Sequence, residues 1–311
     1  MDSQQLETEN PNHCYDVLEP WLVETMPRSS LRWRWEMFLN WFHWRGKIIK
    51  KHIKALIGSS KRSVKNYRTA DHVKNTYGRT WSSVVWPHPR KPKSRKDRTL
   101  AEWNEKGLVL TREGINFVHL ERVMKVVDLT KPSTVLEVGA GMGLNLLTLS
   151  CCFPGTKFAG VELTAEGVAR AKSVQEEDTL PDVIASFSVF ELKDRTAHKT
   201  IDFRQGDATR LPFDDNSFDL VFSRLALEQM ELIRDQAISE MVRVSKKAVL
   251  MVEPFADFNL EGQRPLAIRA KNYFSLSTQD VQKYDLELMA VFGNWPQKIS
   301  EGAGLAYYHL K

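Results

Sequence analysis

The stretch VLEVGAGMGLN, residues 135–145, joins a short apolar run to three glycines at alternate positions, Gly139, Gly141 and Gly143. The apolar run predicts a buried strand, and the apolar residues after the glycines predict a helix. Glycine permits a tight turn and a close approach of the backbone to a ligand, and a helix N-terminus offers unpaired N–H groups. The stretch therefore predicts a strand, a ligand-binding turn and a helix in direct succession.

The spacing of these glycines distinguishes two classes of ligand-binding turn. A dinucleotide-binding turn has the pattern G-x-G-x-x-G, which would place a third glycine at position 144, where this chain has leucine. The pattern here is G-x-G-x-G, with Glu137 two residues before the first glycine. The spacing therefore argues against a dinucleotide.

An alternation of strand and helix patterns continues on both sides of this stretch. Strand patterns occupy residues 133–141 (including the glycine turn), 157–163, 201–208, 218–224 and 247–255, and helical patterns occupy residues 114–129, 144–153, 164–177 and 227–245. Strands separated by helices of this length predict an α/β fold, a doubly wound parallel sheet with helices on both faces. In such a sheet the ligand binds at the carboxyl ends of the strands, where the glycine turn lies.

Positive charge is concentrated ahead of this domain. Residues 45–98 contain seventeen Lys/Arg and two Asp/Glu, although the whole chain has a net charge of only +5. This asymmetry indicates a polyanionic partner: an anionic membrane surface, a nucleic acid or a phosphorylated substrate. The prolines and cations of residues 87–99 predict an exposed linker. We therefore divide the chain into an N-terminal accessory region, residues 1–112, and a domain of residues 113–311.

The composition predicts a cytoplasmic protein, with the inner face of a membrane as an alternative peripheral location. No apolar run reaches the ~18–20 residues of a transmembrane helix, and residues 1–10 lack the features of a signal peptide. Cys151 and Cys152 lie in an apolar run and Cys14 stands alone, so we expect buried thiols and no metal site.

Four motifs in order make residues 113–311 resemble the S-adenosylmethionine-dependent methyltransferases of the seven-stranded Rossmann-like (class I) superfamily. Glu137 and the three glycines match the first motif, and Glu162 closes the second strand in GVEL. GDATRLPFDDNSFDLVFS (206–223) resembles the third and fourth motifs, and RVSKKAVLMVEP (243–254) resembles the fifth strand. The resemblance implies a mostly parallel seven-stranded sheet whose last strand is antiparallel.

The resemblance also implies a cofactor, S-adenosylmethionine, and a set of residues that bind it. Glu162 would accept hydrogen bonds from the ribose hydroxyls, Asp207 would accept one from the adenine amino group, and the backbone of Ala208 would donate. The full set implied is Glu137, Gly139, Ala140, Gly141, Gly143, Glu162, Asp207, Ala208 and Ser223.

Methyl transfer from a sulfonium needs mainly the positioning of two reactants, so we expect neither a nucleophilic triad nor a metal. A base is needed only where the acceptor loses a proton. Many relatives carry histidine in the segment that matches LALEQM, where this chain has Gln229. The candidate catalytic residues near the ends of the fourth and fifth strands are Arg224, Glu228 and Glu253, each with structural packing as the alternative. His119 and His309 are expected to be packing or surface residues.

The segment RWRWEMFLNWFHWRGKIIKKHIK, residues 32–54, predicts a helix that is apolar over a wide arc. One narrow polar side gathers Arg32, Glu36, Asn40, His43, Lys47, Lys50 and Lys54. A wide arc favours burial against protein, whereas the interrupting Arg34, Arg45 and Lys51 suit a helix at a membrane surface. Contact with nucleic acid is disfavoured because the tryptophans share faces with aliphatic residues.

Three functional hypotheses follow from these residues. The first is a methyltransferase acting on a small-molecule, glycan or lipid-linked acceptor, with peripheral membrane contact through residues 32–54. The second is an RNA methyltransferase that holds phosphates with residues 45–98. The third is a catalytically silent adenosylmethionine-binding scaffold. In the two enzymatic hypotheses, residues 1–112 shape or cover the acceptor site. The acceptor atom and the oligomeric state stay open.

Overall fold

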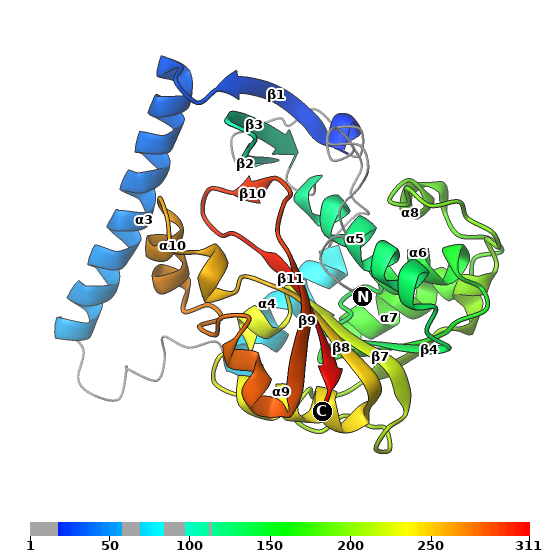
Figure 1. The fold of residues 1–311 in the computed structure, drawn as a ribbon. Coiled ribbons are helices and arrows are strands. Elements are labelled where there is room, and N and C mark those ends of the chain that lie inside the picture. The colour runs from blue at the N-terminus through cyan, green and yellow to red at the C-terminus, as the bar shows by residue number, and fades with distance from the viewer. Residues whose placement is uncertain (1–17, 58–68, 84–96, 112–113) are drawn as a thin grey trace.

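A computed structural model describes residues 18–57, 69–83, 97–111 and 114–311. Its centre is a seven-stranded sheet with the order β6-β5-β4-β7-β8-β11-β9 (Figure 1). The strands are β4 (Thr134–Val138), β5 (Lys157–Glu162), β6 (Asp202–Gln205), β7 (Phe218–Arg224), β8 (Ser245–Glu253), β9 (Leu286–Phe292) and β11 (Gly304–Leu310). β11 runs antiparallel to β8 and β9. This confirms the predicted fold class, including the antiparallel last strand.

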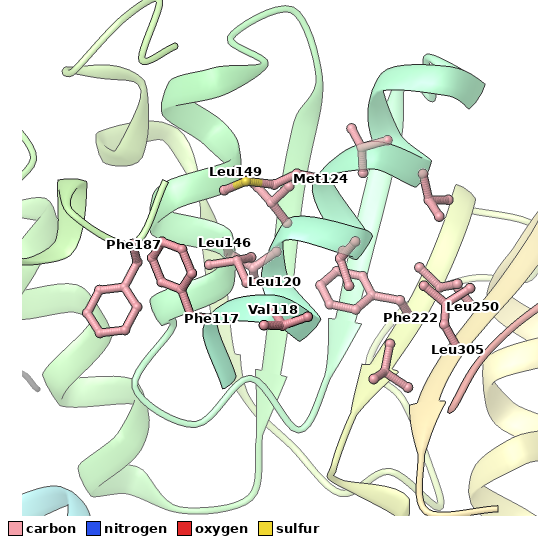
Figure 2. Close-up of a cluster of buried hydrophobic side chains, with 14 of the residues drawn as sticks. Phe117, Val118, Leu120, Met124, Leu146, Leu149, Phe187, Phe222, Leu250 and Leu305 are labelled. Carbon is pink, nitrogen blue, oxygen red and sulfur yellow. The ribbon is translucent and has the colours of Figure 1, made fainter. Parts of the chain in front are cut away.

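Helices cover both faces of this sheet. They are α5 (Gly114–Thr130), α6 (Leu144–Cys152), α7 (Ala165–Gln175), α8 (Asp182–Ala185), α9 (Arg234–Val244) and α10 (Arg264–Lys271). Neighbouring strand residues point to opposite faces, so Val135 packs in one core and Leu136 in the other. Figure 2 shows the first core, where Leu120 and Met124 of α5 and Leu146 of α6 pack over the strands.

The helix predicted at residues 227–245 is shorter in the structure. Leu227–Gln229 form a 3₁₀ turn (η6), and α9 begins only at Arg234. The prediction was wrong here because the carboxylate of Glu253 accepts the backbone N–H groups of residues 226–228 and so holds them as a separate turn. A helical pattern in sequence contains no sign of such a distant acceptor.

The described part of the N-terminal region contains the helices α3 (Leu31–Ile57) and α4 (Ala70–Ser83), and it contributes strands to a second sheet that the sequence did not predict. This sheet has the order β1-β3-β2-β10, with β1 (Leu22–Pro27), β2 (Arg98–Trp103), β3 (Lys106–Thr111) and β10 (Gln297–Lys298). The turn between β2 and β3 places Asn104 and Glu105 at φ 46° and 60°. Hairpin turns with such angles are usually recognised in a sequence by glycine at the second position, and glutamate rarely adopts them. The sequence therefore gives only a weak indication of this hairpin.

The accessory region and the large domain share one hydrophobic core. Leu18 and Trp21 are buried in the cluster that also contains residues of α5 and β4. The ring of Trp21 lies 5.6 Å from that of Phe117 and 5.0 Å from that of Phe187. The predicted boundary at residues 112 and 113 lies outside the described residues, as does most of the predicted linker, whose last two residues belong to β2.

Helix α3 is confirmed, but its apolar arc is divided between two surroundings. Trp33 and Trp44 are buried, whereas Phe38 and Phe42 are exposed. The expectation of burial thus holds for one part of the arc and is wrong for the other, since α3 packs on protein with a single side. Across the described residues, no helix has the length and apolar character needed to cross a bilayer.

Candidate functional site

A cavity of about 1390 Å³ opens at the carboxyl ends of β4, β5 and β7, where the glycine turn was expected to bind a ligand. One wall consists of residues after these strands, among them the glycine turn, Glu162 and Asp207. The opposite wall comes from α3, α4 and β2, with residues that include Asn40, Trp44, Tyr77, Trp81 and Arg98. The described part of the accessory region therefore forms one side of the site.

The glycine turn requires glycine both for its backbone angles and for close packing against other residues. Gly139, Gly141 and Gly143 have φ values of 80°, 56° and 79°, which non-glycine residues rarely adopt. A Cβ atom on Gly139 would lie 2.4 Å from the Cβ of Ala226. The N–H groups of Gly139 and Ala140 both donate to the carbonyl of Val161, which fixes the turn beside β5.

Glu162 lies at the end of β5 with its carboxylate facing the cavity. Its Oε2 accepts the N–H of Gly141 at 3.0 Å, and its Oε1 accepts the backbone N–H and the hydroxyl of Thr164 at 3.0 and 2.7 Å. Thr164 also caps α7, as its position in the sequence predicts. These contacts hold the carboxylate where a diol of a bound ligand could donate to it.

Glu137 is buried in the cavity wall, and sequence reasoning missed its partner. Asn145 in the first turn of α6 donates to Glu137 Oε1 at 2.5 Å, whereas Oε2 has no hydrogen-bond partner. Burial raises the pKa of Glu137 to about 8 against the opposing effect of this hydrogen bond. The only sequence signal for Asn145 is a polar residue in an otherwise apolar helix.

Asp207 and Ala208 form the adjacent part of the wall. Asp207 Oδ1 accepts the backbone N–H and the hydroxyl of Thr209 at 2.9 and 2.8 Å, so this residue shapes a turn as well as facing the cavity. Ala208 is buried beside it. Both line the cavity, and their contacts with adenine stay a prediction of the resemblance.

Two of the three candidate catalytic residues line the cavity. Arg224 and Glu228 do so, whereas Glu253 and the predicted cofactor residue Ser223 are absent from its lining. Ser223 donates to Glu253 Oε1 at 3.0 Å, and both side chains are fully buried. The structure thus places these two residues behind the cavity wall, where Glu253 holds the turn that carries Glu228.

Glu228 stands in a cluster of buried charges. Burial and the neighbouring carboxylates of Glu301 and Glu253 raise the pKa of Glu228 to about 8. Glu301 forms ion pairs with Lys271 and, at 3.4 Å, with Lys298, and these cations lower the pKa of Glu301. Sequence reasoning missed Lys298 and Glu301, which follow no recognisable motif.

Gln229, which takes the place of a histidine found in many relatives, donates to Glu228 Oε1 at 2.6 Å. Oε2 of Glu228 is buried and has no hydrogen-bond partner. His119 is a packing residue, buried with its ring 5.1 Å from that of Trp295. Burial and the nearby cations of Arg224 and Lys298 keep the pKa of His119 well below its usual value.

The polar groups of the cavity wall fit S-adenosylmethionine. The glycine turn, Glu162 and Asp207 line the cavity, and Oε2 of the buried Glu137 lacks a hydrogen-bond partner. Among the described residues, no three His, Cys, Asp or Glu side chains gather as a metal site would require.

Comparison with known proteins shows what the domain is similar to. Residues 136–252 match a family model described as a methyltransferase domain. The uncharacterized methyltransferase YcgJ of Bacillus subtilis (strain 168) is 27% identical over 164 residues, which cover 52% of this chain and 51% of that protein. The chloroplastic 2-phytyl-1,4-beta-naphthoquinone methyltransferase of Arabidopsis thaliana is 28% identical over 179 residues, 57% of this chain and 66% of that protein.

A solved structure shares the fold. Magnesium protoporphyrin IX methyltransferase (ChlM) from Synechocystis PCC 6803, with bound SAH, superimposes with a TM-score of 0.53 and 10% identity, over 78% of this chain and 98% of that chain. The present chain spans about half of YcgJ and 66% of the Arabidopsis protein. Motifs, fold and family match agree: residues 136–252 carry a methyltransferase domain, and the seven-stranded sheet has the fold of the S-adenosylmethionine-dependent class I superfamily.

Proposed function

We propose that this protein transfers the methyl group of S-adenosylmethionine to a hydroxyl group of a small-molecule acceptor. When bound, the cofactor supplies an electrophilic methyl group on sulfur. The cavity of about 1390 Å³ exceeds the usual ~300–1,000 Å³ of a small-molecule site, so it has room for cofactor and acceptor together. The proposal concerns the whole chain, whereas the comparisons cover mainly the cofactor-binding domain.

In this proposal the acceptor lies against the wall formed by α3 and α4. Trp44, Tyr77 and Trp81 line the cavity there, and Trp81 packs against the glycine turn, 3.1 Å from where a Cβ of Gly141 would stand. Aromatic walls suit a flat or apolar acceptor body. The Arabidopsis relative, whose name gives a naphthoquinone as acceptor, supports an acceptor of this class.

Glu228 carries the proposal, because it combines a cavity position with an unused acceptor atom. Gln229 orients the carboxyl group through Oε1 and leaves Oε2 for the acceptor hydroxyl. Bound S-adenosylmethionine would supply the methyl group that the acceptor oxygen takes, with the thioether as leaving group, and Glu228 Oε2 would accept the proton that the hydroxyl loses. A carboxyl group whose pKa is raised to about 8 is a stronger base than an ordinary carboxylate.

The test is a transfer screen with S-adenosylmethionine labelled in its methyl group, applied to fractionated cell extract. We expect label in low-molecular-weight, organic-soluble products that resist cleavage by mild base, as methyl ethers do. Label in RNA would support the second hypothesis, whose basic segment lies partly outside the described residues. A protein that binds the cofactor but labels no fraction would contradict the proposal and favour a silent scaffold.

A further inference from the structure

The outer face of α3 exposes apolar side chains at helical spacing. We define the outer face as Leu31, Trp35, Phe38, Phe42, Ile49 and Ile53, which lie within a narrow arc at about 100° per residue. Their exposed fractions range from 47% to 82%, and Phe42 and Trp35 expose 65% and 60%. These six make up most of the large hydrophobic side chains that are exposed among the described residues. Exposed apolar surface is therefore concentrated on one helix.

The inner face of α3 holds the helix firmly on the protein. Trp33 is buried over Gly107 of β3, and Trp44 is buried with the ammonium group of Lys271 5.0 Å from its ring centre. Asn40 donates to Gln263 Oε1 at 2.8 Å, and Gln263 donates to the carbonyl of Met37 at 2.6 Å. Figure 1 shows α3 along one side of the molecule next to α10. The outer face is therefore presented by a fixed helix.

Cations flank the outer face on both sides. Arg34 and Arg45 lie along one edge, and Arg32 and Lys50 lie along the other, at helical spacing. Residues 31–57 contain seven Lys/Arg and one Asp/Glu, and the single acid, Glu36, lines the cavity instead. An apolar stripe bordered by long basic side chains is the pattern of a helix that lies in a lipid interface and contacts anionic headgroups.

We propose that α3 docks this protein on an anionic lipid surface, with its outer face among the headgroups and upper acyl chains and its flanking cations on lipid phosphates and carboxylates. The stripe from Leu31 to Ile53 is about 33 Å long, which suits a helix parallel to the surface. A second copy of the chain is a poorer occupant, since two such helices would bring like charges together.

The same helix connects this surface with the cavity. Leu39 lies between the outer face and the cavity, and His43 and Lys47 of the next turns line the cavity as well. The docked protein would therefore hold the cavity close to the lipid, so that an apolar acceptor could reach it from the bilayer. This consequence rests on the proposed function, whereas the docking itself does not.

The test is flotation of the full-length protein with vesicles of phosphatidylcholine, alone or with about 30 mol% phosphatidylserine. We expect flotation with the anionic vesicles and its loss at high salt. Phe38→Glu/Phe42→Glu should reduce flotation at least about tenfold, since it puts charge in the apolar interface. The matched control Leu129→Glu/Val189→Glu changes two exposed apolar residues elsewhere and should float like the unchanged protein.

Circular dichroism and binding of S-adenosylmethionine establish that each variant is folded. Failure of the unchanged protein to float with anionic vesicles would overturn the docking proposal, as would equal flotation of the outer-face variant. A dimer in solution that the outer-face variant disperses, without lipid binding, would assign the face to a second copy. Flotation requires no turnover, so its failure is distinct from a failure of the methyl-transfer screen.

Discussion

The backbone N–H of Glu228 donates to Oε2 of Glu253 at 3.2 Å, so one buried glutamate holds the backbone of the other. The other oxygen of Glu253 accepts from Ser223, Ala226 and Leu227 at 3.0–3.1 Å. Glu253 thereby serves as a positioning residue for the turn after β7, and Glu228 is the carboxyl group that reaches the cavity.

Glu228→Gln should lower kcat by roughly 10²–10⁴-fold while leaving the affinity for S-adenosylmethionine within about twofold, because the change removes a proton acceptor and preserves volume. The measurement is steady-state methyl transfer alongside calorimetric cofactor binding. Glu261→Gln, at an exposed site away from the cavity lining, is the control. Unchanged kcat in the Glu228 variant would remove it from the mechanism.

The pH dependence of kcat should report the titration of Glu228. Since only the ionised carboxylate accepts a proton and burial raises its pKa to about 8, kcat should rise with pH up to about 8 and then level off. Gln at position 228 cannot titrate, so this rising limb should disappear. A profile of the same shape in both proteins would assign the limb to another group.

Glu253→Gln should destabilise the fold by roughly 2–4 kcal/mol, because the amide keeps one acceptor oxygen and turns its NH2 group toward the donors that the other oxygen had accepted. Ser223→Ala removes one hydrogen bond and should cost about 1 kcal/mol. Urea unfolding followed by circular dichroism measures both. Equal effects of the two substitutions would mean that Glu253 does not hold the turn.

Gly141→Arg should abolish binding of S-adenosylmethionine, with affinity reduced at least about 100-fold, because the side chain would enter the cavity from a left-handed backbone position beside Trp81. Calorimetry measures the affinity, and thermal unfolding verifies the fold. Gly155→Arg is the matched control, since a Cβ there meets no atom within 4 Å. Unchanged affinity in the Gly141 variant would mean that the cofactor binds elsewhere.

Stability should fall as pH rises from about 4.5 to about 8, in part through Glu137. Its pKa is raised to about 8 in the folded state, so between these values the folded chain keeps a proton that the unfolded chain releases. The contribution is fully present below the unfolded pKa and is lost by about 8, with a slope of up to about 1.4 kcal/mol per pH unit. Glu137→Gln should flatten the slope in urea unfolding at several pH values; parallel curves for both proteins would contradict this.

The sequence alone determined the large domain and the cofactor-binding half of the site. The apolar runs, the spacing of Gly139, Gly141 and Gly143, and the carboxylates Glu162 and Asp207 are local patterns, and each follows a strand that any parallel sheet brings to the same edge. Local patterns of this kind can be recognised in a single sequence, because the backbone geometry requires those residue types at those positions.

The tertiary structure decided what depends on residues far apart in the chain. It placed Glu253 beneath the turn of Glu228, brought Lys298 and Glu301 into the cavity wall, and joined β10 of the tail to β2. It also decided which side of α3 packs against the rest of the protein. The periodicity of the sequence shows that the helix has a wide apolar arc, but not which residues contact that arc. Burial and hydrogen bonding depend on distances in space, and residues some 25 to 200 positions apart carry no shared sequence signal of their contact.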